Sequence, residues 1–595
     1  MAHLLVIGGA SSDILHFAGQ TAISAGGAGM YTAMAAHRCG VQVSLYAPRP
    51  SPIPDTLRPV ADRLTTWQGP FVPPEELGHF DIAYQAGKTT YLKASLGAES
   101  SLTTEALPPD LSIYDCVHIT PLLDAQRQLT FLQACRQRGA KRISVGTFLD
   151  VCVDKPDVVR VIMDQADFFF MNEHEAVGLF GSLEKAKTLP GKVLFVTLGN
   201  KGALVIQGDF VTRLHAVPAI ELDSTGAGDT FCGATVAHIL QGFHPVMAAH
   251  SAASLAAQMI EHVGPTALFW SDTPPGVPVD PRVVVNESQV QKVSQLIATL
   301  SEVTPFNFTG SDLPPVGHPT ALDYFFTSTV QQFSFWTTKN NKYHQPLIAP
   351  INGVKLKGSS YLYQAYLRHL DGDPEFYTPA RQAEESRSEM LNLFRSDDGT
   401  DPMPALELHL AQARGYGQDM LVLKLTPDEV VRQAQGSSKP LQTFFGLLDQ
   451  IGGYKEDPLR KKSGLLALSL NQRPEVFLSF GKDKQVTPVI DYHVMRSCLR
   501  IGLVDVVDQE LSKKLTDRQV LQPAEEWAVR YPSYIAIEKV VANSGKSMGA
   551  VDWFFFNSRK RCPEMTEPVC QRCQVDPVCA HRKDLFQPVL RTTFY

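Results

Sequence analysis

Apolar residues follow two alternating spacings along the first 270 or so residues. Short continuous apolar runs are typical of buried strands, and apolar residues repeated about every 3.6 positions are typical of helices. The runs expected to form strands are LLVIGG, VQVSLYA, CVHIT, RISVGTF, DFFFMN and VLFVTLG. Helices are expected between them, for example over 121–138 and 229–241. This alternation predicts a doubly wound α/β domain with a mostly parallel sheet.

The pattern changes after a Pro-rich stretch at 272–281. A helical segment at 286–301 and a polar segment at 308–319 look like a connection between domains. From residue 320 onward helical spacing dominates and strand-like runs are rare. The predicted organisation is an α/β domain at 1–283, a linker at 284–318 and an all-α domain at 319–595.

Composition and charge narrow the class of protein. The 595 residues are 44% hydrophobic and 19% charged, which suffices for two domains with full cores. No apolar run approaches the roughly 20 residues of a membrane span, and the start, MAHLLVIGG, resembles a strand and not a signal peptide. Residues 286–595 hold 35 Lys and Arg against 35 Asp and Glu, without the basic excess that gripping nucleic acid requires. We expect a cytoplasmic protein acting on a small molecule, with no membrane or nucleic-acid partner.

The sharpest motif is DSTGAGDTF at 223–231, directly before a helical segment. A Gly-rich turn at a helix N-terminus presents N–H groups and the positive dipole end to an anion. The small residues Gly226, Ala227 and Gly228 let that backbone approach a phosphoryl group. Asp229, at the helix start, can take the proton from an attacking hydroxyl. The alternative interpretation is an ordinary Gly-rich helix entry.

This motif resembles the second signature of the PfkB/ribokinase family, D-T-x-G-A-G-D, and further matches follow the family's order over about 270 residues. The resemblance implies a ribokinase-like kinase domain that uses ATP and Mg²⁺, with Asp229 as catalytic base. It implies substrate contacts by Asp13, Gly26, Gly27 and Asp223, ATP and magnesium contacts by Asn172, Glu175, Thr197, Gly199 and Gly202, and an anion hole at Gly226, Ala227 and Gly228. Taken alone, Asp13 also suits a turn and Asn172 a helix cap.

Two departures from the family pattern leave the acceptor open. Many members have Asn shortly after the Gly pair, where this chain has Tyr31, an aromatic suited either to stacking or to packing. Ser224 replaces the middle Thr of the signature, near the family's monovalent-cation loop. The resemblance therefore implies phosphorylation of a sugar or nucleoside hydroxyl, with a monovalent cation as a further expected cofactor.

Four cysteines crowd near the C-terminus, at Cys562, Cys570, Cys573 and Cys579, while the other six are scattered singly. In a cytoplasmic protein such a cluster indicates a metal site more often than disulfides, which are the alternative. The spacing resembles the C-terminal loop of endonuclease III-type helix-hairpin-helix glycosylases, C-x6-C-x2-C-x5-C, lengthened by one residue. That resemblance implies a 4Fe–4S cluster, with Zn²⁺ as the alternative.

A second segment, 487–505, is similar to the part of that superfamily that carries its catalytic Asp, V-D-x-H-x-x-R. The match places the Asp at Asp491, followed by His493 and Arg496. A carboxylate there can stabilise the cationic sugar formed as an N-glycosidic bond breaks. The alternative is an Asp that caps the following helix.

The departures from this superfamily point away from DNA. The usual hairpin, L-P-G-x-G, is absent from the nearest segment, 451–470. The position of the Schiff-base lysine of bifunctional members falls near Leu468 and Ser469, and neither residue can form an imine. Lys461 and Lys462 are expected to be solvated or phosphate-facing, and the alternative is that one of them is shifted into the Schiff-base role. We therefore expect hydrolysis without strand cleavage.

The segment 322–346 contains an Asp followed by F-x-F-W and resembles the queuosine salvage proteins, nucleotide glycosylases related to this superfamily. The resemblance implies a base pocket that includes Phe335 and Trp336, for which packing in the core is the alternative. The chain is therefore predicted to phosphorylate a nucleoside, such as a queuosine-like one, at its 5′-hydroxyl and then release its base. A DNA glycosylase joined to a sugar kinase, and a sugar kinase with a non-catalytic metal-binding module, are the alternatives.

Overall fold

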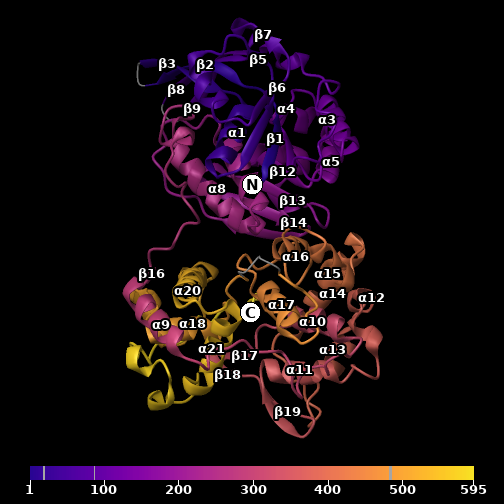
Figure 1. The fold of residues 1–595 in the computed structure, drawn as a ribbon, viewed down its shortest axis with the longest axis vertical. Coiled ribbons are helices and arrows are strands. Elements are labelled where there is room, and N and C mark those ends of the chain that lie inside the picture. Colours follow the sequence, from indigo (N-terminus) through magenta and orange to yellow (C-terminus); the bar gives the residue numbers. More distant parts are fainter. Residues whose placement is uncertain (18–19, 86–87, 481–485) are drawn as a thin grey trace. The chain divides into compact units, whose positions relative to one another are not determined.

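The computed structural model describes residues 1–17, 20–85, 88–480 and 486–595. The chain forms two compact units, Met1–Pro278 and Val279–Tyr595, which are treated separately below (Figure 1). Within the described ranges, none of the helices combines the length and the apolar character needed to cross a bilayer.

The N-terminal unit is built on a nine-stranded sheet. Its strands, in spatial order, are β15 (Phe210–Leu214), β14 (Ala203–Gln207), β13 (Val193–Thr197), β12 (Phe168–Asn172), β11 (Ile143–Gly146), β10 (Cys116–Ile119), β1 (His3–Ile7), β4 (Gln42–Tyr46) and β6 (Thr66–Gln68). Neighbours pair in parallel from β13 to β6, whereas β13–β14 and β14–β15 are antiparallel. All six runs predicted as strands lie in this sheet, which confirms the α/β prediction.

Helices cover both faces of the sheet because its strands are apolar on both sides. Along β1, Leu4 and Val6 join one core cluster, while Leu5 and Ile7 join the other. One face packs against α1 (Ala28–Arg38), α7 (Ala227–Leu240) and α8 (Pro245–Ile260), and the other against α3 (Ala125–Gln137), α4 (Leu149–Asp154), α5 (Pro156–Gln165) and α6 (Glu173–Phe180).

A smaller sheet, absent from the sequence-based prediction, carries two predicted site residues. It runs in the order β3 (Gln20–Gly26), β2 (Ser11–Phe17), β8 (His79–Gln85) and β9 (Lys88–Ser95). Short elements complete the unit: β5 (Arg49–Pro50) paired with β7 (Phe71–Val72), and α2 (Arg58–Ala61). Asp13 lies on β2 and Gly26 ends β3, so this sheet brings both to the site.

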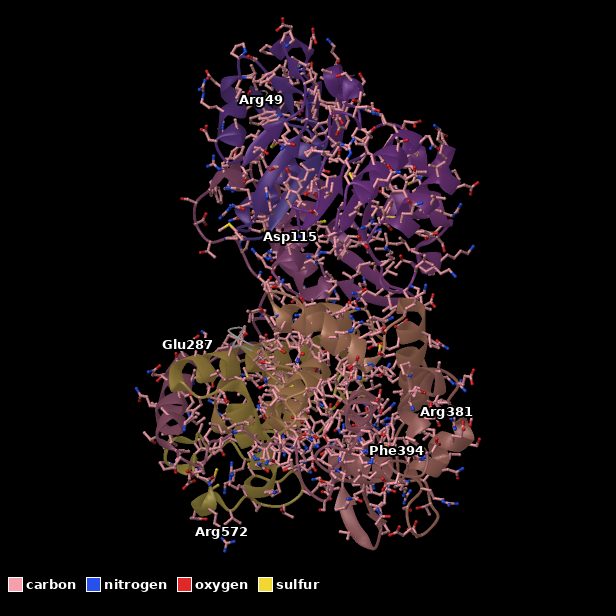
Figure 2. All side chains as sticks on the ribbon, turned by 45° about the vertical axis from the view of Figure 1, so that its right-hand side comes forward. Arg49, Asp115, Glu287, Arg381, Phe394 and Arg572 are labelled. Atoms are coloured by element: carbon pink, nitrogen blue, oxygen red, sulfur yellow. The ribbon has the colours of Figure 1, made fainter. Side chains whose placement is uncertain are left out.

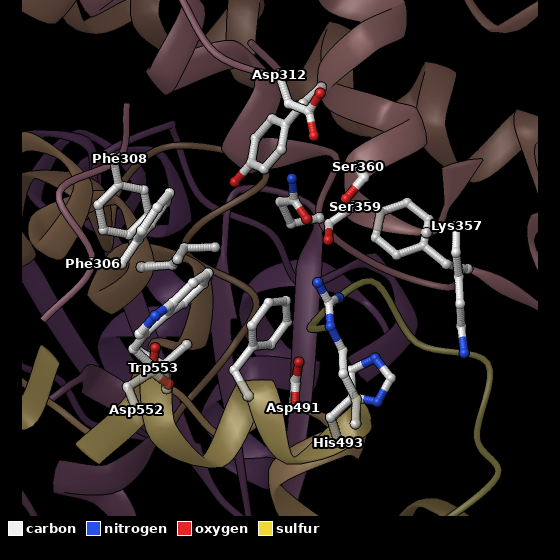
Figure 3. A pocket seen from close by; sticks show the side chains of 18 of the residues that line it. Phe306, Phe308, Asp312, Lys357, Ser359, Ser360, Asp491, His493, Asp552 and Trp553 are labelled. Carbon is white, nitrogen blue, oxygen red and sulfur yellow. The ribbon is translucent and has the colours of Figure 1, made fainter. Parts of the chain in front are cut away.

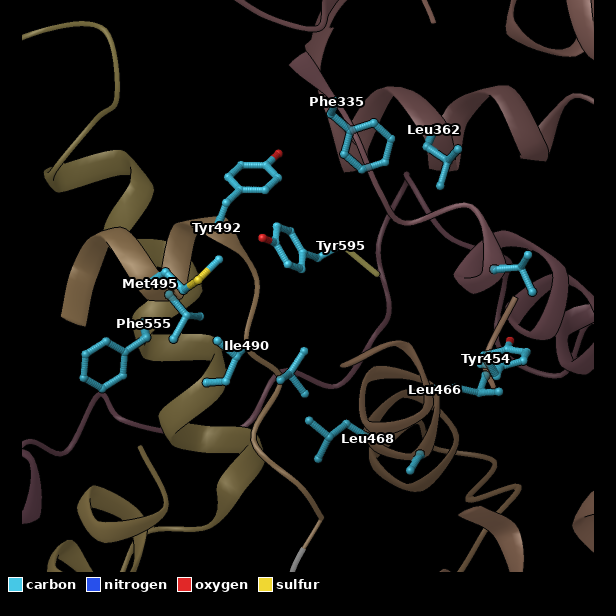
Figure 4. Close-up of a cluster of buried hydrophobic side chains, with 14 of the residues drawn as sticks. Phe335, Leu362, Tyr454, Leu466, Leu468, Ile490, Tyr492, Met495, Phe555 and Tyr595 are labelled. Carbon is cyan, nitrogen blue, oxygen red and sulfur yellow. The ribbon is translucent and has the colours of Figure 1, made fainter. Parts of the chain in front are cut away.

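The C-terminal unit is largely helical. Its helices are α9 (Glu287–Thr299), α10 (Ala321–Val330), α11 (Ser359–Leu367), α12 (Pro379–Ala383), α13 (Arg387–Phe394), α14 (Leu406–Leu423), α15 (Pro427–Gln435), α16 (Pro440–Leu448), α17 (Lys461–Gln472), α18 (Tyr492–Ile501), α19 (Gln509–Thr516), α20 (Pro523–Ser544) and α21 (Met548–Arg561). Its described strands form two-stranded pairs: β16 (Val283–Val285) with β21 (Val504–Val506), β17 (Trp336–Lys339) with β18 (Lys342–Pro346), and β19 (Ile348–Ile351) with β20 (Val354–Lys357). Side chains from α11, α17, α18 and α21 meet in one core (Figure 4).

The segment 284–318, expected to be a linker, is packed into the C-terminal unit. Strand β16 pairs with β21, and α9 buries Val290, Val293 and Ile297 in the core. The aromatic Phe308 is buried in the same core. These apolar side chains hold the segment against the helices, so the compact unit begins at Val279 instead of residue 319.

Candidate active sites

Two adjacent strands of the large sheet end at residues predicted to bind the nucleotide. Asn172 ends β12, Thr197 ends β13, and the two are partners in the parallel register. Asn172 Oδ1 accepts the Glu175 N–H at 2.9 Å, and Glu175 Oε2 accepts the Asn172 N–H at 2.7 Å. Burial raises the pKa of Glu175 to about 7, with a further contribution from Asp229. The helix cap and the N-x-x-E motif are therefore one arrangement, close to Asp229.

The glycines after β13 differ in what they permit. Gly199 has a φ of 59° and open space where a Cβ would stand. Gly202 has a φ of 97°, and a Cβ there would lie 1.9 Å from the carbonyl oxygen of Leu214. Gly202 is therefore required by the close approach of the backbone at Leu214, whereas Gly199 leaves room for a ligand.

The turn before α7 leaves an open helix N-terminus. Gly226 is the N-cap with a φ of 75°, and the Tyr31 ring lies 2.4 Å from where its Cβ would stand. The Ala227 N–H donates to the Ser224 carbonyl oxygen at 3.2 Å. In the described structure no side chain caps this helix, and a Cβ at Gly228 would meet no atom within 4 Å. The positive end of the helix therefore faces space that suits a phosphoryl group.

Asp229 and Asp223 serve this turn differently. Asp229 lies in the first turn of α7, and burial raises its pKa to about 7. A carboxylate that titrates near neutral pH is suited to accept a proton from a hydroxyl. Asp223 is fully buried, and its oxygens accept the N–H groups of Thr225 at 2.9 Å and Gly264 at 2.7 Å. Asp223 therefore shapes the turn.

The smaller sheet brings Asp13 against the Gly-Gly pair. A Cβ at Gly26 would lie 1.8 Å from Asp13 Oδ2, and one at Gly27, whose φ is 93°, would lie 2.6 Å from the Gly9 carbonyl oxygen. Asp13 is buried and accepts the Phe80 N–H at 3.1 Å. Burial raises its pKa to about 6. Gly26 is therefore needed for Asp13 to fit, and Gly27 for the close approach of the backbone at Gly9.

Tyr31, the departure from the family pattern, packs on the catalytic turn. It is buried, and burial raises its pKa well above the usual range, with Asp223, Tyr84, Asp13 and Asp229 adding to the effect. Its hydroxyl therefore stays neutral beside the carboxylates. The ring is held against Gly226, the packing that the sequence offered as one of two alternatives.

The C-terminal unit encloses a cavity of about 270 Å³ (Figure 3). Asp491, at the start of α18, lines this cavity, and so does Phe335. Both residues were predicted from the sequence as candidate site residues. Trp336 is not among the lining residues and packs against Arg591, whose guanidinium lies 4.2 Å from its ring. One wall comes from Phe306–Leu313, in the segment expected to be a linker. The aromatic residues Phe306 and Phe308 in this otherwise polar segment were the sequence feature that could have indicated a pocket wall.

Asp491 both caps a helix and lines the cavity, so the two alternatives for this residue are compatible. It is the N-cap of α18, and its Oδ1 accepts the Val494 N–H at 2.9 Å. It also lines the cavity. The next two motif residues are buried beside it, with an Arg496 nitrogen 3.1 Å from His493 Nδ1. His493 lines the cavity as well, so the motif positions a carboxylate and an imidazole on one wall.

Sequence reasoning did not single out a second carboxylate in this cavity, Asp552 on α21. Burial raises its pKa to about 8, and Asp491 adds to this. It is therefore largely protonated at neutral pH. In the sequence, Asp552 is simply an Asp followed by aromatic residues. No motif distinguishes it from an ordinary exposed Asp on a helix.

Lys461 and Lys462 are buried, contrary to the solvated pair expected from the sequence. They are 5% and 1% exposed. Lys461 lines the cavity, and its Nζ donates to the Gln332 carbonyl oxygen at 3.0 Å. Burial lowers its pKa, while Asp491, Asp457 and Asp552 oppose this shift. Asp457 accepts the Lys461 N–H at 2.8 Å and forms a bidentate pair with Arg530, so a buried network fixes the start of α17.

The four clustered cysteines are free thiols in a loop at the end of α21. They are half-buried, and 3₁₀ turns start at Cys570 and end just before Cys579. Burial raises the pKa of Cys579, and the other three thiols add to the effect. Donor atoms of Cys570, Asp576 and His581 also lie within 4.8 Å of one another. The thiols of this loop, with the nearby carboxylate and imidazole, are donors that suit a thiophilic metal.

Family comparisons match the two units separately. Residues 86–272 match the pfkB family carbohydrate kinases, and residues 314–573 match the queuosine salvage proteins. The chain joins a PfkB kinase domain to a queuosine salvage domain. The salvage match includes Phe335, Asp491, Asp552 and three of the clustered cysteines, and it ends before Cys579.

Individual relatives match the kinase domain. A cytidine kinase of Thermococcus kodakarensis is 27% identical over 254 residues, which is 41% of this chain and 90% of that protein. A ribokinase of Lactococcus lactis is 39% identical over 75 residues, 12% of this chain and 25% of that protein. A solved ribokinase of Cryptococcus neoformans in complex with ADP is 22% identical, with a TM-score of 0.39, covering 45% of this chain and 96% of that one.

Proposed function

We propose that the chain carries out two consecutive salvage steps, phosphorylation of a nucleoside 5′-hydroxyl and hydrolysis of the N-glycosidic bond of the resulting nucleotide. The observation that carries the second step is the pair of carboxylates in one cavity, Asp491 at a helix N-terminus and a protonated Asp552. A buried carboxyl group whose pKa is raised can act as a proton donor near neutral pH. The products are a free base and ribose 5-phosphate.

In the kinase domain, the oxygen of the acceptor hydroxyl attacks the γ-phosphoryl group of ATP, and ADP leaves. Asp229 accepts the proton of that hydroxyl. The open N-terminus of α7 at Gly226–Gly228 stabilises the charge on the transferred group. Asn172 and Glu175 are proposed to organise Mg²⁺, which neutralises phosphate charge when bound, and a monovalent cation is proposed beside Ser224. The names of the relatives, cytidine kinase and ribokinase, support a nucleoside or sugar acceptor.

In the salvage domain, Asp491 stabilises the cationic sugar as the C1′–N bond lengthens. Asp552 donates a proton or hydrogen bond to the departing base, and water completes the hydrolysis. The Nζ of Lys461 donates to the Gln332 carbonyl oxygen, and we propose that Lys461 serves as a hydrogen-bond donor in the cavity wall, although burial lowers its pKa. We therefore retain a hydrolytic, monofunctional mechanism.

The turn between α16 and α17 favours a free nucleotide over DNA. We propose that α16, residues 449–460 and α17 correspond to the helix-hairpin-helix element. The basic residues of this turn are buried and paired, Lys455 with Asp419 at 2.6 Å and Arg460 with Asp449 at 2.5 Å. Buried cations that are already paired are not available to bind a DNA phosphate. The alternative of a DNA repair enzyme therefore lacks the phosphate clamp that it requires.

The cysteine loop is proposed to hold a 4Fe–4S cluster, with Zn²⁺ as the alternative, through Cys562, Cys570, Cys573 and Cys579. Such a centre supplies a cross-link among four points of the chain. No step of either reaction passes through it.

A nucleoside panel tests the proposal. Full-length protein is incubated with ATP, Mg²⁺ and single nucleosides, including queuosine, and both ADP and free base are quantified. A substrate yields both products in wild type, ADP and nucleotide only in Asp491→Asn, and neither in Asp229→Asn. ADP without base from every nucleoside, even when the 5′-nucleotide is supplied directly, would instead support a kinase with a non-catalytic module.

A further inference from the structure

The cysteine loop closes over the ends of the two helices that build the salvage cavity. Helix α18 starts at Asp491 and α21 carries Asp552, so both bring residues to the cavity. At their far ends, the Cys562 N–H donates to the Ser558 carbonyl oxygen at 2.7 Å, and the Ala580 N–H donates to that of Ile501 at 3.0 Å. The loop therefore spans from the end of α21 to the end of α18 (its Arg572 is labelled in Figure 2).

Arg500, in the last turn of α18, joins the two ends of this loop. Its Nη1 donates to Cys562 Sγ at 3.2 Å and to the Pro563 carbonyl oxygen at 2.9 Å. Its own carbonyl oxygen accepts the Arg582 N–H at 3.1 Å and lies 3.7 Å from Cys579 Sγ. The first and last of the four cysteines are thus positioned by one residue of α18.

Glu564 connects the cysteine loop to the wall of the cavity. Its carboxylate is buried, pairs with Lys357 Nζ and lies 3.7 Å from Arg496 Nη1, while Gln587 Nε2 donates to it at 3.3 Å. Lys357 lines the cavity. Arg496 in turn contacts His493, which also lines it. One carboxylate therefore holds two cations that support the wall.

The backbone around Glu564 has little support of its own. Residues 563–569 form no helix or strand. Besides the Glu564 pairs, the described ion pair of this stretch is Glu567 with Lys583 at 3.8 Å, and Glu567 is largely exposed. Exposed pairs contribute little stability. At its start the stretch is held by Arg500, which donates to Cys562 Sγ and to the Pro563 carbonyl oxygen, and it ends at Cys570.

We propose that the four thiols bind one metal centre and that this centre, by holding Cys562 and Cys570, keeps Glu564 between Lys357 and Arg496 and so maintains the salvage cavity. Loading of the metal then controls base release while phosphorylation continues. The effect on base release rests on the proposed N-glycosidase, whereas metal binding and the placement of Glu564 are measured without it.

Full-length protein purified without oxygen is analysed for iron, zinc and acid-labile sulfide, and hydrogen exchange is followed by mass spectrometry. Iron with sulfide, or zinc without it, supports the metal centre and identifies it. The variant Cys573→Ser is expected to lose the metal, to exchange at least about tenfold faster in 354–360 and 563–569, and to release base at least about tenfold more slowly. Its ADP formation should equal that of wild type, which reports on folding of the kinase domain, and unchanged exchange in α10 and α14 reports on folding of the salvage domain.

Two further variants separate the metal from the carboxylate. Glu564→Gln is expected to keep the metal yet lose protection in 354–360. Val569→Ala, an exposed neighbour of Cys570, should match wild type in every measurement. Absence of bound metal, or unchanged exchange in both Cys573→Ser and Glu564→Gln, overturns the proposal. If wild type releases no base, the proposed N-glycosidase fails, while metal content and exchange still decide this inference.

Discussion

The two sites of this chain are assembled in different ways. The kinase turn is one contiguous stretch, 223–229, whose contribution is largely backbone geometry at a helix N-terminus. The salvage cavity is assembled from side chains spread from Phe306 to Tyr595. Charge on a phosphoryl group is spread over several oxygens, so a short run of N–H groups can stabilise it. A base and a sugar cation need shape and separate carboxylates, which only tertiary structure supplies.

The largest expected effect is that of Asp229→Asn. Loss of the base should lower ADP formation roughly 100- to 10,000-fold. Base release from a supplied 5′-nucleotide should stay at the wild-type rate, since Asp229 belongs to the other unit. A coupled ADP assay and chromatography of the base measure the two. Near-normal phosphorylation would remove Asp229 from the mechanism.

Asp491→Asn should lower base release roughly 100- to 1,000-fold, by analogy with the loss of one charge-stabilising group. Its amide oxygen can still accept the Val494 N–H, so the helix cap is preserved. Asp508→Asn is the matched control, because Asp508 caps α19 in the same way and does not line the cavity. Equal rates of base release in both variants would show that Asp491 only caps the helix.

Gly226→Ala tests whether the kinase turn depends on backbone geometry. An alanine would hold a φ of 75° and collide with the Tyr31 ring, at a cost of about 1–3 kcal/mol. The expected result is lower ADP formation and a lower thermal midpoint. In Gly181→Ala the φ is 83° but no atom lies within 4 Å, so only the conformational cost remains. Matching losses in the two variants would show that the Tyr31 contact is immaterial.

The pH profiles should run in opposite directions. Asp229 must be ionised to act as a base, and with a pKa of about 7 its activity rises between pH 6 and 8, roughly tenfold per unit below 7. Asp552 must be protonated to act as a donor, and with a pKa of about 8 base release falls above pH 8. Initial rates across pH 6–9 measure both. Parallel profiles would contradict these assignments.

Sequence patterns predicted the parts of the fold whose signal is local. The β12 run FFFM is apolar throughout because both faces of the sheet are covered. The smaller sheet was missed because β3 buries only its last two residues and shows no clean alternation. The cavity was predicted only at Asp491 and Phe335, whereas Asp552 and Lys461 become site residues through helix packing that no local spacing encodes.

The register between β12 and β13 constrains how the proposed ATP site can evolve. Asn172 and Thr197 are direct partners. A one-residue insertion in either strand would slide one against the other and turn its final side chain to the opposite face. Changes in length are therefore tolerated only in the loops beyond these strand ends, and relatives that share this site should keep both strands free of insertions.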